Sequence, residues 1–353
     1  MTAAPRIVVV GAGIIGASIA WHLAHAGQSV FVLDAAEAGG QATQHSWAWI
    51  NPGWDQPVPY RQLRLQAVRE WQRLAGRLPE LELRWCGVLR WDRPEAELRV
   101  LAQRGGAALQ VLERDAIARC EPQLVMPPAL ALHAGSDGVV EPFGAARLLL
   151  ASARAHGARL LTHCPAVALE AQAGRMVAVR TERTRIAADL VIVAAGVGTS
   201  SLLGSLGLQL RLRHAPAILV QTPVQPRLLN GLLVTPNASI RQRPDGRLSL
   251  CDDLADDDAA TLSAAAHRVV DEAARLLDLP LHAEAVHLAE RPMPEDGLPA
   301  VGWVESVPGL YLAVTHSGVT LAPALGHYVA QEVLGGEREP LLRRYGPGRV
   351  LSG

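Results

Sequence analysis

Three glycines near the start of the chain have the spacing of a phosphate-binding loop. Gly11, Gly13 and Gly16 form the pattern G-x-G-x-x-G, and Asp34 follows 18 positions after Gly16. Glycine permits a tight turn, a close approach of the backbone to a pyrophosphate, and close packing of a helix on a strand. An aspartate at this distance can accept a hydrogen bond from a ribose 2′-hydroxyl. The pattern therefore predicts an adenine-dinucleotide site, without saying which dinucleotide.

The glycine motif lies between a predicted strand and a predicted helix, the setting in which such a motif binds a dinucleotide. Residues 6–10, "RIVVV", are predicted to be a buried strand, and "ASIAWHLAHAG" after the glycines has the apolar spacing of a helix. The helix N-terminus would offer free N–H groups and a partial positive charge to the phosphates. "SVFVLD" is predicted to be the second strand, which ends at Asp34. Residues 1–34 are therefore expected to form one βαβ unit.

The rest of the chain mixes helical and strand patterns. An antiparallel region is predicted at 211–290, where residues alternate between apolar and polar and Asp245–Gly246 signals a turn. The tail at 338–353 is expected to be a partly mobile surface segment. The other predicted elements are an arginine-rich amphipathic helix at 60–77, a hairpin at 166–182, apolar strands at 188–196 and 309–314, and helices at about 258–277 and 321–334.

Composition excludes several classes of protein. The 353 residues carry a formal net charge of −1, so no global field favours nucleic acid or an anionic membrane. All basic side chains are arginines, which excludes a Schiff-base lysine and a P-loop lysine. The four cysteines are far apart and are expected to be free thiols. No apolar run has the length of a membrane span and the N-terminus lacks the features of a signal peptide, so we expect a cytoplasmic protein. The acidic run at 252–258 is predicted to be a solvated loop and helix start, and no metal site is predicted.

Two later segments favour FAD over NAD as the dinucleotide. The first is "ADLVIVAAGVGTSSLLGSLG", a second apolar strand that ends in small residues, and the second is the C-terminal run from Arg291 to Val329. If the C-terminal part of the chain returns to the dinucleotide domain, the domain can hold a long cofactor along its length.

With these motifs the chain resembles the D-amino-acid-oxidase-like flavoproteins, which include glycine oxidase, sarcosine oxidase and D-amino-acid dehydrogenases. The resemblance runs from "RIVVVGAGIIG" to "LAPALGHYVAQEVL". It implies an α/β fold with a discontinuous Rossmann-like FAD domain and an α+β substrate domain built on an antiparallel sheet. The boundaries that we predict are 1–80, 137–212 and 289–353 for the FAD domain, and 81–136 and 213–288 for the substrate domain.

The resemblance also implies the chemistry. These flavoproteins oxidise a C–N bond by hydride transfer to flavin N5, and the resulting imine hydrolyses. Arg291 aligns with the carboxylate-binding arginine of glycine oxidase, a task that suits a bidentate guanidinium. The backbone N–H groups of Thr320 and Leu321 would face the flavin N1–C2 edge at a helix N-terminus. His316 would lie beside the flavin and position substrate or tune the flavin charge.

The chain departs from its relatives at several points. The segment that holds the second carboxylate-binding arginine of glycine oxidase is about two residues shorter here. A lysine used by sarcosine oxidase aligns with Thr320, and residues 286–303 contain no cysteine for a covalent flavin bond. Arg241 is a candidate for supplying the missing charge, the alternative being an exposed strand arginine.

The segment "GGQATQHSWAWINPGW" at 39–54 would run along the cofactor. Trp47 and Trp49 alternate, so in an extended segment they would face the same side. His45 aligns with a histidine that some relatives join covalently to the flavin, although we expect noncovalent FAD. The residues predicted to contact FAD are Gly11, Gly13, Ile14, Ile15, Gly16, Asp34, Ala35, Gly40, Ala42, Thr43, His45, Ser46, Trp47, Val167, Ala195, Gly196, Arg291, Ser317, Gly318, Val319, Thr320 and Leu321.

The function predicted from the sequence is FAD-dependent oxidation of an amino acid or amine, with O₂ or another electron acceptor. One alternative is a flavoprotein subunit that works within a hetero-oligomeric dehydrogenase. Another is an NAD-dependent dehydrogenase. A small-molecule substrate, and either a homo-oligomer or a partner subunit, fit these predictions, whereas nucleic acid and an integral membrane segment do not.

Overall fold

The FAD-domain strands form a six-stranded sheet in the computed structural model, which describes residues 5–353. Residues 1–4 of the predicted first segment lie outside the described residues. The strand order is β22-β23-β13-β1-β2-β9, and every pair is parallel except β22 with β23. The strands are β1 (Ile7–Val10), β2 (Val30–Leu33), β9 (Arg159–Leu161), β13 (Leu190–Val193), β22 (Ala300–Trp303) and β23 (Leu310–Val314).

Both faces of this sheet are covered, which explains why β1 is apolar along its whole length. On one face, residues such as Val9 and Ile192 pack with helices α1 (Ile14–His25), α5 (Pro142–Ala155) and α8 (Gly318–Val333). Helix α2 (Val58–Arg77) belongs to the same core. On the other face, Val8 and Val191 pack with the three-stranded sheet of β10 (Ala166–Gln172), β11 (Arg175–Thr181) and β12 (Arg185–Ala187), and with α6 (Thr199–Gly204). The predicted βαβ unit is confirmed as β1–α1–β2.

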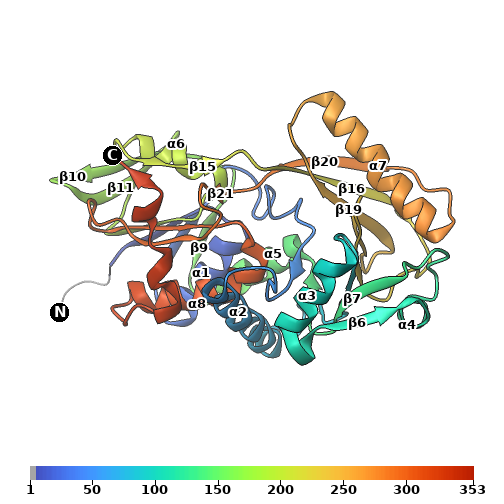
Figure 1. Ribbon diagram of the computed structural model, residues 1–353. Helices are drawn as coiled ribbons and strands as arrows, with labels where there is room; N and C mark the ends of the chain where they lie inside the picture. Colours follow the sequence, from blue (N-terminus) through green and yellow to red (C-terminus); the bar gives the residue numbers. More distant parts are fainter. Residues whose placement is uncertain (1–4) are drawn as a thin grey trace.

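An eight-stranded sheet forms the other half of the molecule, in the order β20-β16-β19-β18-β17-β5-β7-β6. It is antiparallel apart from the parallel pair β17–β5. Helix α7 (Ala259–Leu277) covers one face, as the upper right of Figure 1 shows. The strands are β5 (Val88–Arg90), β6 (Gln110–Glu113), β7 (Leu130–Ala134), β16 (Pro216–Val224), β17 (Leu232–Val234), β18 (Ser239–Gln242), β19 (Arg247–Asp253) and β20 (Ala285–Glu290).

Shorter elements complete the chain. The predicted hairpin at 166–182 is confirmed as the antiparallel pair β10–β11. The remaining elements are α3 (Glu95–Gly105), α4 (Arg114–Cys120), α6 (Thr199–Gly204), β3 (Trp49–Ile50), β4 (Leu83–Arg84), β8 (Gly138–Val140), β10 (Ala166–Gln172), β11 (Arg175–Thr181), β12 (Arg185–Ala187), β14 (Gln209–Leu210), β15 (Leu212–Arg213), β21 (Met293–Pro294), β24 (Leu351–Ser352), and 3-10 turns at Gly106–Ala108, Gly196–Gly198, Pro340–Tyr345 and Pro347–Arg349.

The α/β fold class is confirmed, whereas the exact domain boundaries stay a prediction. One expectation is wrong: the tail at 338–353 does not lie loosely on the surface. Leu342, Tyr345 and Val350 are buried, and β24 pairs with β14. The acidic run ends as expected, because Asp258 accepts hydrogen bonds from Ala260 and Thr261 at the start of α7.

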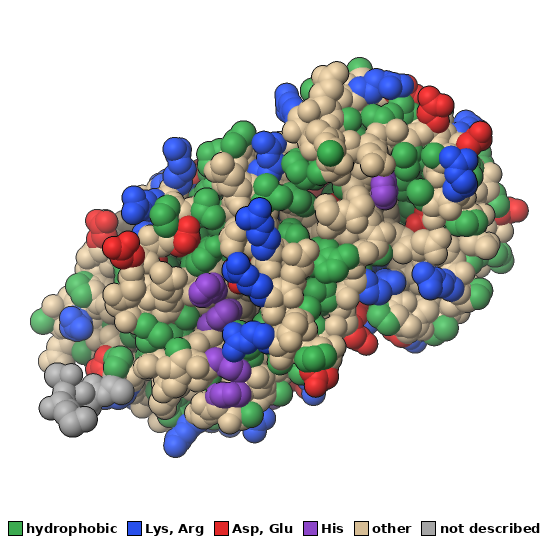
Figure 2. Space-filling model, turned by 90° about the horizontal axis from the view of Figure 1, so that it is seen from below, with side chains coloured by type: hydrophobic (Ala, Val, Ile, Leu, Met, Phe, Trp, Pro, Cys, Tyr) green, Lys and Arg blue, Asp and Glu red, His purple; other side chains and the backbone are tan. Residues whose placement is uncertain are grey.

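Histidine side chains gather on one face of the molecule (Figure 2). The helices on the six-stranded sheet contribute two stacked pairs, His22 with His327 and His25 with His156, with ring centroids 5.5 and 3.8 Å apart. Burial is the main cause that lowers the pKa of His22 to about 3. His22 therefore stays neutral in the folded protein at every ordinary pH. No helix within residues 5–353 combines the length and the apolar character that crossing a membrane requires.

Candidate active site

The glycine motif forms a cradle that any side chain would fill. A Cβ atom on Gly11, whose φ is +106°, would lie 2.3 Å from the Ala194 carbonyl oxygen, and one on Gly16 would lie 1.9 Å from the Gly11 oxygen. Backbone and side chains therefore leave room only for glycine between β1, α1 and β13. Gly13 faces Thr43, whose Oγ1 accepts from the Ile14 N–H at 3.0 Å.

Asp34 stands at the carboxyl end of β2, as predicted. Its Oδ2 accepts from the Ala12 N–H at 2.6 Å and its Oδ1 from the Ala36 N–H at 2.9 Å. Burial raises the pKa of this carboxyl, and the two N–H donors lower it in part. Each carboxylate oxygen keeps a further lone pair, so Asp34 can hold the glycine loop and still accept from a ribose hydroxyl.

The other residues predicted around the dinucleotide follow β2 and β13 or lie on α1 and β10. Ala195 and Gly196 directly follow β13, and the Ala194 N–H donates to Val10 of β1. The exposed Val167 lies on β10, and Cys164 nearby donates its N–H to the Asp34 carbonyl. Ala35, Gly40 and Ala42 lie in the loop after β2, and Ile15 is a buried residue of α1 that would contact a side chain at Gly318.

The loop after β2 runs between the two halves of the molecule (blue in Figure 1). His45 stacks on His287 of β20, with ring centroids 4.4 Å apart, and the Trp47 indole donates to the Ser249 carbonyl of β19 at 3.1 Å. Ser46 accepts from the Ala48 N–H. The segment thus contacts the face of the eight-stranded sheet opposite α7.

The assumption of an extended segment at Trp47 and Trp49 is wrong, because Ala48 between them has a φ of +62°. The two rings meet edge to face instead, with centroids 5.9 Å apart. The Trp49 indole donates to Asp137 Oδ2 at 2.8 Å. Burial raises the pKa of Asp137 to about 7, against the lowering effects of the Trp49 hydrogen bond, Arg64 and Arg90.

The start of α8 contacts the segment at 39–54. Ser317 precedes the helix in a left-handed conformation, with φ 57° and ψ 25°. The first turn contains Gly318, Val319, Thr320 and Leu321; it has no side-chain cap and no acidic residue, so its positive end is free to face an anion. The buried Thr320 hydroxyl donates to the Trp49 carbonyl at 3.0 Å, which fixes the helix end against the segment at 39–54.

His316 lies just before that helix end, where the charge of Arg291 reaches it. Burial lowers the pKa of His316 to about 4, helped by the charges of Arg291, Arg64 and Arg213 and opposed by Asp253. His316 is therefore neutral at pH 7. The Arg291 guanidinium is held at one end by a hydrogen bond from Nε to the Ala215 carbonyl at 3.0 Å. Its Nη1 pairs with Asp253 Oδ1 at 2.8 Å.

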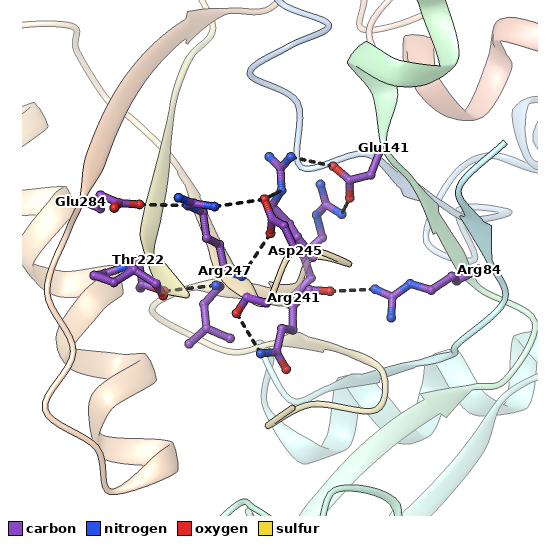
Figure 3. Close-up of polar contacts among 12 residues, drawn as sticks. Arg84, Glu141, Thr222, Arg241, Asp245, Arg247 and Glu284 are labelled. Atoms are coloured by element: carbon purple, nitrogen blue, oxygen red, sulfur yellow. Dashed lines mark hydrogen bonds and ion pairs between the residues drawn. The ribbon is translucent and has the colours of Figure 1, made fainter. Parts of the chain in front are cut away.

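Arg241 lies elsewhere in the substrate half. Only 1% of its surface is exposed, and its Nη1 is bound to Glu141 Oε1. Figure 3 shows the Arg241 side chain directed at this carboxylate, which Arg243 also approaches at 3.2 Å. Because Glu141 occupies the Arg241 guanidinium, the pair joins β18 to the start of α5. It does not present a free charge.

Arg64 of α2 is a site residue that the sequence analysis missed. Its side chain is buried, and its Nη1 donates to Ser317 Oγ at 2.7 Å. One signal could have identified it, since Arg64 occupies a position on the apolar stripe of α2, one turn from Tyr60 and two turns from Trp71.

Comparison with known proteins identifies the family. The family model "FAD dependent oxidoreductase" matches residues 6–332. The chain belongs to this family. The FAD prediction is confirmed, and the NAD-dependent alternative is wrong. The glycine cradle, Asp34 and the free end of α8 fit this cofactor.

Individual relatives span the same length as this chain. It is 26% identical to a glycine oxidase of Bacillus licheniformis, over 93% of this chain and 92% of that protein. It is also 26% identical to one of the subunits of an opine oxidase from Agrobacterium tumefaciens, over 94% of each chain. Among solved structures, an iminodiacetate oxidase from Chelativorans sp. BNC1 superposes with a TM-score of 0.85 at 23% identity, over 97% of this chain and 99% of that one.

Proposed function

We propose that this FAD-dependent oxidoreductase oxidises the C–N bond of an amino acid or a secondary amine that carries a carboxylate. The supporting observation is Arg291, whose charge reaches the neutral His316 two residues before the free end of α8. FAD supplies the hydride acceptor in such a reaction. The protein must bind the carboxylate, keep the amine unprotonated and orient the C–H bond.

Arg291 is built to bind a carboxylate. The Ala215 carbonyl fixes one side of its guanidinium, while its ion-pair partner Asp253 has a side chain that is 72% exposed. An exposed partner contributes little to the pair, so a substrate carboxylate can displace it. Bidentate binding would then orient the rest of the substrate.

His316 contributes a neutral acceptor. Since its pKa is about 4, the imidazole carries no charge at pH 7 and can accept a hydrogen bond from a substrate amine. A neutral ring also avoids repelling a bound ammonium before the proton leaves. We therefore assign His316 to substrate positioning.

The test is an anaerobic screen of the FAD-loaded protein. Glycine, sarcosine, D-amino acids, proline and iminodiacetate are mixed with the protein, and loss of the oxidised-flavin absorbance is followed. We expect rapid bleaching by at least one carboxylate-bearing amine. Arg291→Gln should lower kcat/KM for that substrate about 100-fold, and Arg291→Lys less, because a charge-assisted pair is lost. Bleaching only by amines without a carboxylate, unchanged in Arg291→Gln, would contradict the proposal.

A second candidate is the catalytic component of a larger oxidoreductase, which the full-length similarity to an opine oxidase subunit favours. Such a component would be reduced by substrate but would turn over slowly alone. Hydrogen peroxide produced in air at the rate of flavin reduction supports an independent oxidase. A flavin that stays reduced in air, together with a companion chain that co-purifies from the native source, supports the role within a larger assembly.

A further inference from the structure

Arg64 is a buried cation held by neutral groups. Its side chain comes from α2 and is 7% exposed. Nε donates to the Asn51 carbonyl at 3.1 Å and Nη2 to Asn51 Oδ1 at 2.7 Å, while Nη1 donates to Ser317 Oγ at 2.7 Å. These three contacts fix the guanidinium plane without neutralising its charge.

Within residues 5–353, no carboxylate forms an ion pair with Arg64. Asp137 is close enough for its pKa to respond to Arg64, yet its Oδ2 accepts from the Trp49 indole. A buried charge without a partner is unfavourable. A buried, unpaired cation at this position is therefore expected to face an anion in the working protein.

The surroundings indicate where such an anion would lie. Ser317, whose Oγ accepts from Arg64, directly precedes α8 in a left-handed conformation. Two turns along α2, the Trp71 indole donates to the Val319 carbonyl at 2.9 Å, so α2 fixes the first turn of α8 at two points. The guanidinium and the positive end of the helix thus converge on one spot, where they would repel each other unless negative charge is present.

We propose that Arg64 is a positioning residue for FAD: it places a fixed positive charge behind Ser317 and stabilises the negative charge of the reduced flavin at its N1–C2 carbonyl edge. Arginine would fill this role in a chain that contains no lysine. The proposal uses the FAD cofactor alone and does not depend on which substrate is oxidised. The alternative is that Arg64 binds a substrate carboxylate.

Two measurements without substrate separate these roles: the midpoint potential of bound FAD and the dissociation constant of sulfite, whose flavin adduct is an anion. Arg64→Gln should lower the potential and weaken sulfite binding at least about tenfold, because one charge in a poorly solvated site is lost. Arg64→Lys should retain most of both. Arg69→Gln, an exposed arginine of the same helix, should change neither.

A second variant keeps Arg64 and cancels its charge. Asn51→Asp preserves the shape of the 2.7 Å contact and supplies a carboxylate to Nη2. We expect it to weaken sulfite binding in the same direction as Arg64→Gln, even if Arg64→Gln loses FAD. Unchanged sulfite binding and potential in Asn51→Asp would overturn the proposal. If Arg64→Gln changed only the KM of a carboxylate substrate, Arg64 would serve the substrate instead.

Discussion

Arg64 and Arg241 are both buried arginines, but they differ in whether a carboxylate pairs with the guanidinium. Arg241 of the eight-stranded sheet is bound to Glu141, and Arg243 shares that carboxylate. Arg64, beside the start of α8, donates hydrogen bonds to Asn51 and Ser317 and lies over the Tyr60 ring, and within residues 5–353 it pairs with no carboxylate. A neutralised arginine can contribute to folding, whereas one without a counter-ion is positioned for a charge that arrives with the cofactor or during the reaction.

The largest expected effect follows from removing the carboxylate of the neutralised pair. Glu141→Gln leaves the almost fully buried Arg241 without a counter-ion, so we expect a loss of about 3–5 kcal/mol in the free energy of unfolding. Urea unfolding of the FAD-free protein measures it. Glu284→Gln breaks the exposed pair with Arg247 and should cost about 0–1 kcal/mol. Equal losses in the two variants would show that burial of Arg241 does not decide the energy.

In the half of the molecule that holds the six-stranded sheet, we expect FAD affinity to depend more on the shape of the glycine loop than on ion pairs. Gly16→Ala would place a Cβ 1.9 Å from the Gly11 oxygen and force the glycine loop to move, so FAD affinity should fall about 100-fold or more. Equilibrium titration of the FAD-free protein with FAD checks this. Among residues 5–353, a Cβ on Gly144 of α5 would meet no atom within 4 Å, so Gly144→Ala should leave FAD binding unchanged. A Gly16→Ala protein with ordinary affinity would mean that the loop is not the pyrophosphate cradle.

The charge around His316 predicts how stability depends on pH. Its pKa is about 4 in the folded protein and 6.5 ordinarily, so below pH 6.5 the unfolded chain binds a proton that the folded protein does not. The contribution of His316 to stability should therefore fall as the pH drops from about 6.5 to about 4. Asp137, whose pKa burial raises to about 7, contributes in the opposite sense over this range, because the folded protein holds the proton that the unfolded chain has lost. The difference in slope between the FAD-free wild type and His316→Gln isolates this contribution, because Asp137 and His22, whose pKa is lowered to about 3, are present in both proteins. An unchanged slope would contradict the buried, cationic surroundings of His316.

The smallest effect should come from the exposed ion pair of the substrate half. Asp253→Asn frees Arg291 from its partner, so an unreactive carboxylate such as acetate should bind roughly threefold more tightly. Titration followed by the flavin difference spectrum measures it. Weaker acetate binding in Asp253→Asn would indicate that Asp253 orients Arg291 for the ligand, contrary to the displacement that we propose.

Much of the fold could be predicted because its signals are local. The apolar run at Ile7–Val10, the helix after it and the strand that ends at Asp34 follow from periodicity over a few residues. The glycine pattern predicted the cradle because its geometry depends on backbone conformation and on the missing Cβ atoms. The tail was harder, since the burial of Tyr345 depends on the sheet and helices already in place.

The segment at 39–54 shows where local reasoning fails. An alternating pattern predicts that Trp47 and Trp49 share a face only if the backbone is extended, and Ala48 is left-handed. Distant partners hold these side chains: Ser249 accepts from one indole and Asp137 from the other. No pattern within the segment contains that information.

By itself the sequence determined the secondary structure around the glycine motif, the acidic residue after β2 and the family-like start of α8. Only the tertiary structure decided which arginine is neutralised and which is not. Arg241 meets a carboxylate 100 positions away, and Arg64 meets a serine 253 positions away. Charge pairing depends on distance in space, and long-range packing alone sets that distance, whereas periodicity and glycine geometry are properties of the local chain.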